Sequence, residues 1–301
     1  MKESPCHCSL NAASRLSTVS DGADSAAYSY VANSPLVDHI VFAHNGLTVM
    51  TTSNKFDNLN RLTGISSASS ASSVVNFQYQ YNLAGQRTWV SLPDGSYWIN
   101  GYDALGQLTS AKKYFWDGTP CAGQQFGFGF DTIGNRLSTV AGGDSNRLNL
   151  RLAGYTNNAL NQIVSRDVPG FVDVMGLTLS TNTVKVNGTK ASQKSEYFWE
   201  PIGTNNSSAP QWLGINVTSS GTNLATVSGS VFLARTPETN FFYDLDGNQL
   251  SDGRFNYNWD AESRLISAIS LASAPAASMS SNIYTYDYIA GVNPEWRLLK
   301  A

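Results

Sequence analysis

The stretch FGFGFDTIGNRLSTV, residues 126–140, decides the fold class. Phe126, Phe128 and Phe130 alternate with two glycines, so the three rings lie on one face of an extended strand. Asp131 and Gly134 follow in the positions of a tight turn, because an Asp side chain accepts hydrogen bonds from nearby backbone amides and glycine reaches positive φ without strain. The stretch therefore predicts a strand, a turn and a return strand.

The glycines of this stretch have a second interpretation, as a loop that binds a nucleotide phosphate. The dinucleotide fingerprint G-x-G-x-x-G leads into a helix, whereas here the third glycine comes five residues after the second and a strand follows. No Lys-Ser or Lys-Thr pair of a P-loop follows either. We therefore expect no cofactor, and we expect that Gly127 and Gly129 mark a close backbone approach or a bend of the sheet.

The same pattern recurs along the chain, which indicates a repeat protein. An aromatic residue comes first, Asp or Asn usually second, Gly or Asn fifth and a long polar residue sixth. Successive copies between residues 56 and 155 start 21–28 residues apart. Copies start at Phe56, Tyr81, Tyr102, Phe130, Tyr243 and Trp259, weaker ones at Leu10 and Tyr155, and a truncated one at Tyr286.

The second and fifth residues of these copies are the predicted turn residues. A position that accepts Gly best and Asn next is typical of positive φ. The predicted structural turn set is Asp57, Asn60, Gly85, Asp103, Gly106, Asp131, Gly134, Asp244, Gly247 and Asp260. Upstream runs such as NFQYQYN (76–82) and RFNYNWD (254–260) alternate aromatic and polar residues, as half-buried strands do.

These patterns predict an all-β chain of repeat hairpins that form one long sheet, with one interruption. Residues 1–9 are expected to be a disordered tail, and residues 10–166 and 240–301 to be repeat hairpins, the last of them truncated. Residues 167–239 lack the repeat and carry short Val/Thr-rich runs between Gly, Asn and Ser turns. This composition predicts an inserted β-sandwich-like module.

The repeated Tyr-Asp-x-x-Gly-Arg/Gln-Leu unit resembles the YD repeat of the RHS (rearrangement hotspot) family, which includes bacterial polymorphic toxins, toxin-complex shell subunits and teneurins. The resemblance covers about residues 10–165 and 240–290. It implies that the hairpins form a long sheet that spirals into a hollow shell. The aspartyl autoproteolytic segment that closes complete toxin shells is not recognisable here, so we expect a fragment or truncated copy of a longer shell protein.

From this resemblance we expect a non-catalytic structural protein, secreted or at the cell surface. It would encapsulate, carry or display another polypeptide, and its partners would be the remainder of a shell or the enclosed chain. A second hypothesis is an adhesion or carbohydrate-binding module, in which Trp199 and Trp212 of the insert stack on cell-surface glycan. The alternative for these rings is packing in the core of the sandwich. A third is an all-β hydrolase.

Composition excludes several other classes of protein. The net charge is −3 and only 14% of residues are charged, which does not fit a nucleic-acid binder. Three cysteines at uneven spacing do not form a disulfide framework, and the three histidines give no metal-ligand spacing. No apolar run is long enough to span a membrane, and the first residues have no signal-peptide pattern. We expect neither a metal nor catalytic residues.

Overall fold

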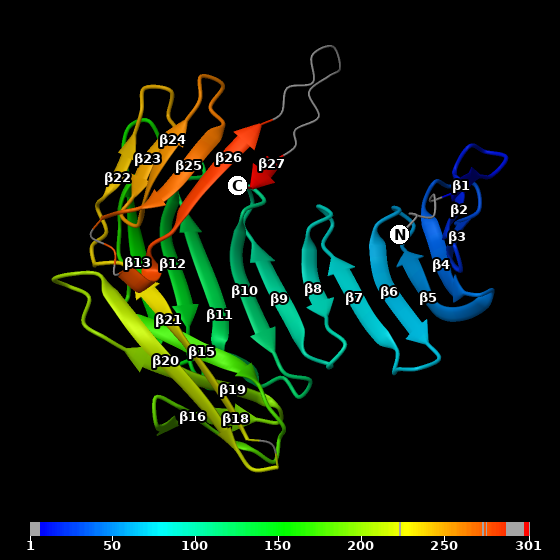
Figure 1. The fold of residues 1–301 in the computed structure, drawn as a ribbon, viewed down its shortest axis with the longest axis horizontal. Helices are drawn as coiled ribbons and strands as arrows, with labels where there is room; N and C mark the ends of the chain where they lie inside the picture. Colours follow the sequence, from blue (N-terminus) through cyan, green and yellow to red (C-terminus); the bar gives the residue numbers. More distant parts are fainter. Residues whose placement is uncertain (1–6, 223, 273, 275, 287–297, 301) are drawn as a thin grey trace. The chain divides into compact units, whose positions relative to one another are not determined.

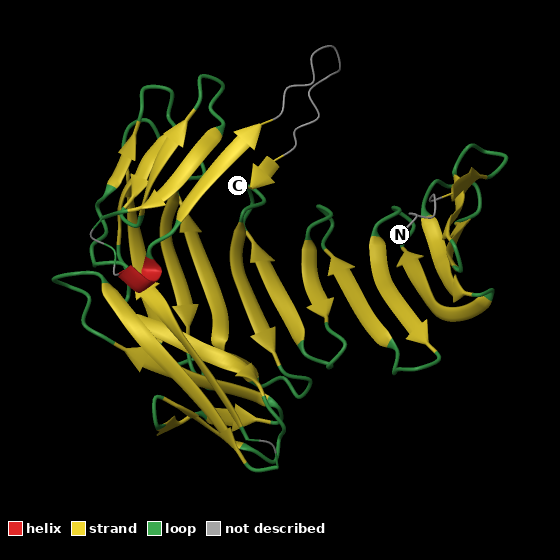
Figure 2. Ribbon diagram, in the orientation of Figure 1, coloured by secondary structure: helices red, strands yellow, loops and turns green. Residues whose placement is uncertain are grey.

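The computed structural model describes residues 7–222, 224–272, 274, 276–286 and 298–300. It confirms the all-β prediction and the long sheet of repeat hairpins: fourteen strands follow one another in chain order, from β1 to β14, in one sheet. Within the described residues the helical structure is limited to one short turn, η1 (Ala276–Ser278), drawn red in Figure 2. The chain divides into two compact units, Met1–Cys121 and Ala122–Ala301.

The first unit is a run of antiparallel hairpins (Figure 1). Its buried residues within the described range are only Gly64, Ser96, Tyr114, Pro120 and Cys121, as expected of a single-layer sheet. Its strands are β1 (His7–Leu10), β2 (Leu16–Asp21), β3 (Asp24–Tyr30), β4 (Val37–His44), β5 (Leu47–Phe56), β6 (Leu62–Ser69), β7 (Val75–Tyr81), β8 (Arg87–Ser91), β9 (Tyr97–Tyr102) and β10 (Leu108–Tyr114).

The second unit contains the last strands of that sheet and three further sheets. The long sheet ends with β11 (Pro120–Phe130), β12 (Arg136–Gly142), β13 (Leu150–Asn157) and β14 (Ile163–Arg166). After the insert, a six-stranded sheet in chain order holds β22 (Phe241–Tyr243), β23 (Gln249–Asp252), β24 (Phe255–Trp259), β25 (Leu265–Ser270), β26 (Ser281–Tyr286) and β27 (Leu298–Lys300).

The insert consists of two sheets that share a small hydrophobic core, as expected of a sandwich. Val184, Val186, Ala191 and Phe198 form this core, and all are at most 7% exposed. One sheet has the order β15 (Phe171–Leu177), β19 (Tyr197–Gly203), β18 (Ser192–Lys194). The other has the order β17 (Thr189–Lys190), β16 (Thr183–Val186), β20 (Gln211–Ser220), β21 (Ala225–Leu233).

The same register closes the hairpins whose turns follow Leu10, Phe56, Tyr81, Tyr102, Phe130, Asn157, Tyr243 and Trp259. Numbering each unit from the residue before its Asp or Asn, position 1 pairs with position 7, and a β-bulge lies just before position 1. Phe56 pairs with Leu62, Tyr81 with Arg87, and Phe130 with Arg136. The bulge adds a residue on one strand only, so it fixes where the turn begins and which side chains share a face.

Two expectations from the sequence need correction. Residues 7–9 of the predicted disordered tail belong to β1 and pair with β2; residues 1–6 lie outside the described range. At Gly129, on the bare face of FGFGF, the closest atom is a side-chain atom rather than a backbone atom, and the bend of the sheet, the other alternative, stays a prediction. A Cβ built on Gly129 would lie 2.5 Å from Ser138 Oγ, because that residue lies opposite on β12.

Candidate functional site

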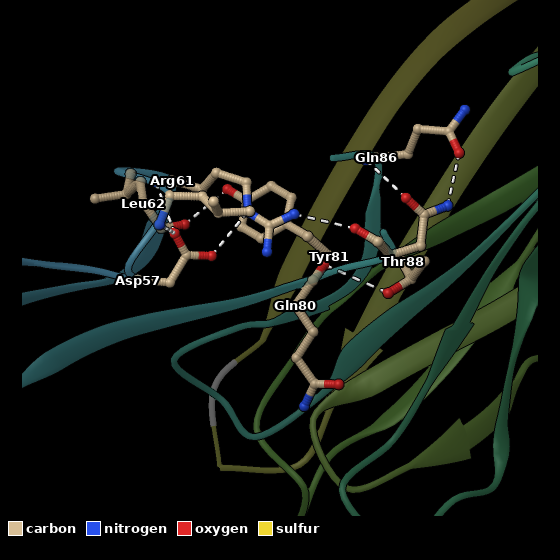
Figure 3. A network of polar contacts seen from close by, with 9 residues as sticks. Asp57, Arg61, Leu62, Gln80, Tyr81, Gln86 and Thr88 are labelled. Atoms are coloured by element: carbon tan, nitrogen blue, oxygen red, sulfur yellow. Dashed lines mark hydrogen bonds and ion pairs between the residues drawn. The ribbon is translucent and has the colours of Figure 1, made fainter. Parts of the chain in front are cut away.

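The repeat turn is built around one carboxylate or amide side chain at position 2. Asp57 Oδ1 accepts hydrogen bonds from the backbone amides of Leu59 (2.9 Å) and Arg61 (3.0 Å). Its second oxygen accepts from Arg61 Nε at 2.7 Å (Figure 3). Asn60, at position 5, has a φ of 61°, the left-handed conformation that a turn of this kind requires. One side chain thus organises the whole loop.

The other predicted turn residues take the same places. Asp103, Asp131, Asp244 and Asp260 each accept the amides of positions 4 and 6 through one oxygen. Gly85, Gly106, Gly134 and Gly247 all have positive φ. Both oxygens of Asp244 accept bonds from its own turn, including one from Asn248 Nδ2 at 3.0 Å, so that carboxylate has the role of a turn residue.

These hydrogen bonds also set the charge of the turn carboxylates. The Arg61 amide, followed by the Arg61 side chain, lowers the pKa of Asp57 despite partial desolvation. The Asn248 side chain lowers the pKa of Asp244 in the same way. At Asp131 and Asp260 burial acts in the opposite direction, but the bonds from Asn135 and Arg264 outweigh it, so each pKa is lowered. The turns are therefore built for ionised carboxylates.

A second set of bonds links each repeat to the next, and we call it the inter-repeat ladder. The side chain at or beside position 1 donates to the backbone carbonyl of position 7 in the preceding unit. Tyr81 Oη donates to the Leu62 carbonyl at 2.7 Å (Figure 3). The other steps are Tyr30 to Leu16 (2.7 Å), Tyr102 to Arg87 (2.9 Å), Asn157 to Arg136 (3.0 Å), Tyr243 to Ile163 (3.0 Å), Trp259 to Gln249 (2.7 Å) and Tyr286 to Leu265 (2.9 Å).

Phenylalanine at position 1 has no group to donate, and one such step is replaced from a neighbouring residue. Asn54 Nδ2, two residues before Phe56, donates to the Val37 carbonyl at 3.0 Å. The donor again lies on the next strand, and its acceptor is the carbonyl of Val37, which pairs with Tyr30 beside a β-bulge. The ladder is therefore a property of the repeat geometry rather than of tyrosine alone.

Arginine at position 6 adds a second link between neighbouring units. The Arg61 guanidinium donates to the Asn82 carbonyl at 3.0 Å and lies 4.9 Å from the centre of the Tyr81 ring (Figure 3). Arg15 lies over Tyr30 at 4.3 Å and Arg264 over Tyr286 at 5.2 Å. A guanidinium above an aromatic face is a favourable contact. Positions 1, 6 and 7 thus couple consecutive turns.

The ladder continues across the insert. Tyr243 comes after the insert and Ile163 before it, yet the Tyr243 hydroxyl donates to the Ile163 carbonyl at 3.0 Å. Just inside this step, Arg166 and Glu238 form an antiparallel bridge with two backbone bonds of 3.0 and 2.8 Å. The second run of repeats is therefore bonded directly to the first, and the insert leaves the array at this bridge.

The unit that the aromatic pattern placed at Tyr155 starts two residues later. Asn158, not Thr156, closes the turn, because its backbone N–H donates to the Gln162 carbonyl at 2.9 Å and Asn161 has a φ of 63°. Asn157 therefore holds position 1 and makes the ladder bond there. The sequence prediction placed the start of the unit at the aromatic residue, whereas Asn158 and Asn161, at positions 2 and 5, mark where the turn lies.

Trp199, the first candidate for glycan stacking, is only 6% exposed and joins the insert to the array. Its Nε1 donates to Asp173 at 2.9 Å, and Asp173 forms an ion pair with Arg151 of β13. A Cβ on Gly123 would lie 2.6 Å from the Trp199 ring, so the ring lies directly on that glycine. A buried face cannot stack on a sugar, and the prediction for Trp199 needs this correction.

Trp212, the second candidate, lies on β20 opposite Phe232 and is half-buried. Its neighbours on that face of the hairpin include Gly214 and Ser230, so part of the ring faces small residues. Stacking of a sugar on Trp212 stays a prediction.

The described residues hold no group of three or more His, Cys, Asp or Glu side chains that would bind a metal ion. His44 contacts Asp24 at 2.7 Å and His39 contacts Asp38 at 2.7 Å, and all four side chains are at least 36% exposed. A hydrolase would need a nucleophile beside such a base.

None of the helices in the described part of the chain is long and apolar enough to cross a membrane.

No family model and no curated protein matches the chain. Similar solved structures include the crystal structure of TcdB2-TccC3-TEV (TM-score 0.44, 13% identity) and that of TcdB2-TccC3 without its hypervariable C-terminal region (0.39, 14%). The Photorhabdus luminescens Tc holotoxin pore is another (0.34, 13%). These matches cover 91–92% of this chain and 15% of each matched chain, so the chain spans a small part of their length.

Proposed function

We propose that this chain is a non-catalytic structural scaffold, a section of an RHS-type β-shell that encapsulates, carries or displays another polypeptide. The observation that carries the proposal is the inter-repeat ladder. Its side chains and arginines are engaged with neighbouring turns, so the polar groups of the repeat hold the sheet together rather than face a small substrate. Secretion or display at a bacterial cell surface belongs to the same proposal.

The hairpin tips support a role in a larger assembly. In six of the turns, position 3 or position 4 carries an exposed leucine or isoleucine, although a solvated loop tip is normally polar. In the first unit these are Leu59 (69% exposed), Leu83 (106%) and Leu105 (70%); in the second they are Ile133 (70%), Leu160 (75%) and Leu245 (105%). Such tips offer contact points for the remainder of a shell.

The proposal is tested by adding a labelled, permanently unfolded polypeptide, such as a reduced and carboxymethylated protein, to the full chain. We expect the polypeptide to sediment with the chain and to be cleaved more slowly by protease. Free sedimentation together with an unchanged cleavage rate would contradict the scaffold role. A parallel screen with ester, peptide and glycoside substrates should show no turnover, and turnover would favour the hydrolase.

A further inference from the structure

The two sheets of the insert differ in extent at one side. β16 lies next to the corner where the chain passes from one sheet to the other. The bond from Ala191 N to the Val184 carbonyl (3.0 Å) continues the pairing of β16 with β17, β18 begins at the next residue, and Val184 N donates to Gln193 Oε1 of β18 at 3.1 Å. Thr178, directly after β15, meets Ser219 of β20 at 3.1 Å. In the four-stranded sheet, β21 follows β20 and is the edge strand. β15 is the edge strand of the facing three-stranded sheet and lies near β20, so β21 extends beyond it.

The core-facing side of β21 is consequently uncovered. Val227 pairs with Val217 and therefore shares its face, and Val217 packs against the hydrophobic core. Val227 is nevertheless 67% exposed, and Ala225, which pairs with Ser219, is exposed as well. A valine that points toward the core side of a sandwich and stays exposed indicates that a layer is missing beneath it.

The neighbouring edge of β15 is free along its main chain. Thr178 N donates to the Glu196 carbonyl and Thr204 N to the Gly170 carbonyl, each at 2.8 Å, so even-numbered residues of β15 bond to β19. The N–H and C=O groups of Asp173, Met175 and Leu177 therefore point away from β19. No hydrogen bond of the described residues uses those groups, and β15 is the edge strand of its sheet.

A cleft of about 440 Å³ lies between this edge and β21. Its lining has no charged side chain and includes Val174, Leu177, Leu179, Phe198, Val217 and Val227. The polar groups in it are already paired, because Asn182 Nδ2 donates to Ser219 Oγ at 2.9 Å and Asn182 Oδ1 accepts from Thr222 N at 3.0 Å. The cleft is continuous with the core, since Val174, Phe198 and Val217 belong to both.

We propose that this cleft, together with the free edge of β15, is a binding slot for an extended polypeptide strand with apolar side chains at alternate positions. The slot continues the interface between the two sheets, and apart from Ala191 the residues that form the core of that interface belong to β-strands. A bound strand would pair its main chain with Asp173, Met175 and Leu177 and place alternate side chains beneath Val227. This is recognition by strand addition, in which the backbone supplies affinity and the pockets supply specificity.

The inference does not rest on the proposed function, since it concerns the insert alone. It is tested with the full chain and a fluorescent peptide of valine alternating with threonine, with a lysine at each end for solubility. We expect saturable binding by fluorescence anisotropy. Val227→Lys should weaken binding at least about tenfold, because it places a charge over the slot. Ser228→Lys is the matched control on the opposite face and should change binding less than about twofold.

Two further measurements separate strand addition from simple apolar binding. Amide exchange at Asp173, Met175 and Leu177 should slow when the peptide is bound. A peptide N-methylated at alternate residues, which keeps its side chains but loses its donors, should bind at least about tenfold more weakly. Equal binding of both peptides, equal effects of the two lysine variants, or binding of an aliphatic probe without any binding of the peptide would overturn the proposal.

The Val227→Lys chain also distinguishes this slot from the scaffold role. Retention of the unfolded polypeptide by that variant, together with loss of the short peptide, would support both proposals as separate sites. Loss of the short peptide together with loss of the unfolded polypeptide would support the slot and contradict retention by the repeat array.

Discussion

At the scale of single residues, Gly123 shows how one position links the insert to the array. Its φ is +77°, and a Cβ there would lie 2.6 Å from the Trp199 ring and 2.9 Å from the end of Met175. Positive φ alone costs a non-glycine residue about 1–2 kcal/mol. The contact adds an overpacking cost, because the ring is held in place by its bond to Asp173.

We therefore expect Gly123→Ala to lower the free energy of unfolding more than a glycine replacement without a close neighbour. Gly188→Ala is the matched control, since it has a similar φ of +86° and nothing within 4 Å of its Cβ position. The difference between the two variants should be about 1–3 kcal/mol, the range for overpacking a core. Urea unfolding followed by tryptophan fluorescence measures it, and equal losses would show that the Trp199 contact yields easily.

The lowered pKa values of the turn carboxylates predict that the free energy of unfolding depends on pH in the acidic range. Folding lowers the pKa of Asp57, mainly through the Arg61 amide, and lowers those of Asp131, Asp244 and Asp260 as well. A lowered pKa in the folded state means that stability is fully present above the unfolded value and is lost as pH falls through the folded value. The free energy of unfolding should therefore decrease below about pH 4, near the ordinary pKa of Asp.

The variant Asp57→Asn measures how much of this pH dependence of stability comes from the Asp57 carboxylate. The Asn side chain can still accept the amides of positions 4 and 6, but it does not titrate. We expect the variant to be less stable at pH 6 and to lose less stability than the native chain between pH 5 and pH 2.5. A pH dependence as steep as that of the native chain would show that this turn contributes nothing to it.

At the scale of the element, the inter-repeat ladder makes each hairpin depend on the one before it. Tyr81 Oη donates to the Leu62 carbonyl at 2.7 Å. Tyr79 lies two residues earlier on the same face of β7, and none of the hydrogen bonds among the described residues involves its hydroxyl. Removing the hydroxyl group from each tyrosine in turn therefore separates the effect of the Tyr81 hydrogen bond from that of losing a hydroxyl on this face of β7.

Tyr81→Phe should lower the free energy of unfolding by about 1 kcal/mol, the usual net worth of such a bond, and more if the carbonyl is left without water. Tyr79→Phe should have little effect. Chemical denaturation of both variants measures the difference. Equal stabilities would mean that solvent replaces the ladder bond at no cost.

The sequence predicted the elements of this array better than their links. Alternating aromatics and the Asp-to-Gly spacing identified strands and turns, because side-chain period and positive φ are local properties. The ladder was not predictable, since its acceptors are main-chain carbonyls such as that of Leu62, which every residue has. The burial of Trp199 depends on Gly123, 76 positions away in the chain, and no local pattern records that contact.

At the scale of the whole molecule, the insert leaves the repeat array at the antiparallel bridge between Arg166 and Glu238. Arg166 and Glu238 exchange two backbone bonds, of 3.0 and 2.8 Å, and the ladder bond from Tyr243 to Ile163 lies beyond them. The predicted limits of the insert, 167–239, would place these bonds at its base. The two runs of repeats should then stay bonded to each other when the insert is replaced by a short turn that joins Arg166 to Glu238.

Replacing residues 167–237 with Asn-Gly tests this independence. A pair that exchanges both backbone bonds is closed by a two-residue turn, and Asn-Gly adopts the type I′ turn that matches strand twist. We expect the shortened chain to keep a β-type circular dichroism spectrum and to unfold with a smaller urea dependence, because less surface is exposed on unfolding. Adding Tyr243→Phe should then destabilise it by about 1 kcal/mol. A shortened chain that loses its β spectrum, or that is insensitive to Tyr243→Phe, would show that the insert holds the two runs of repeats together.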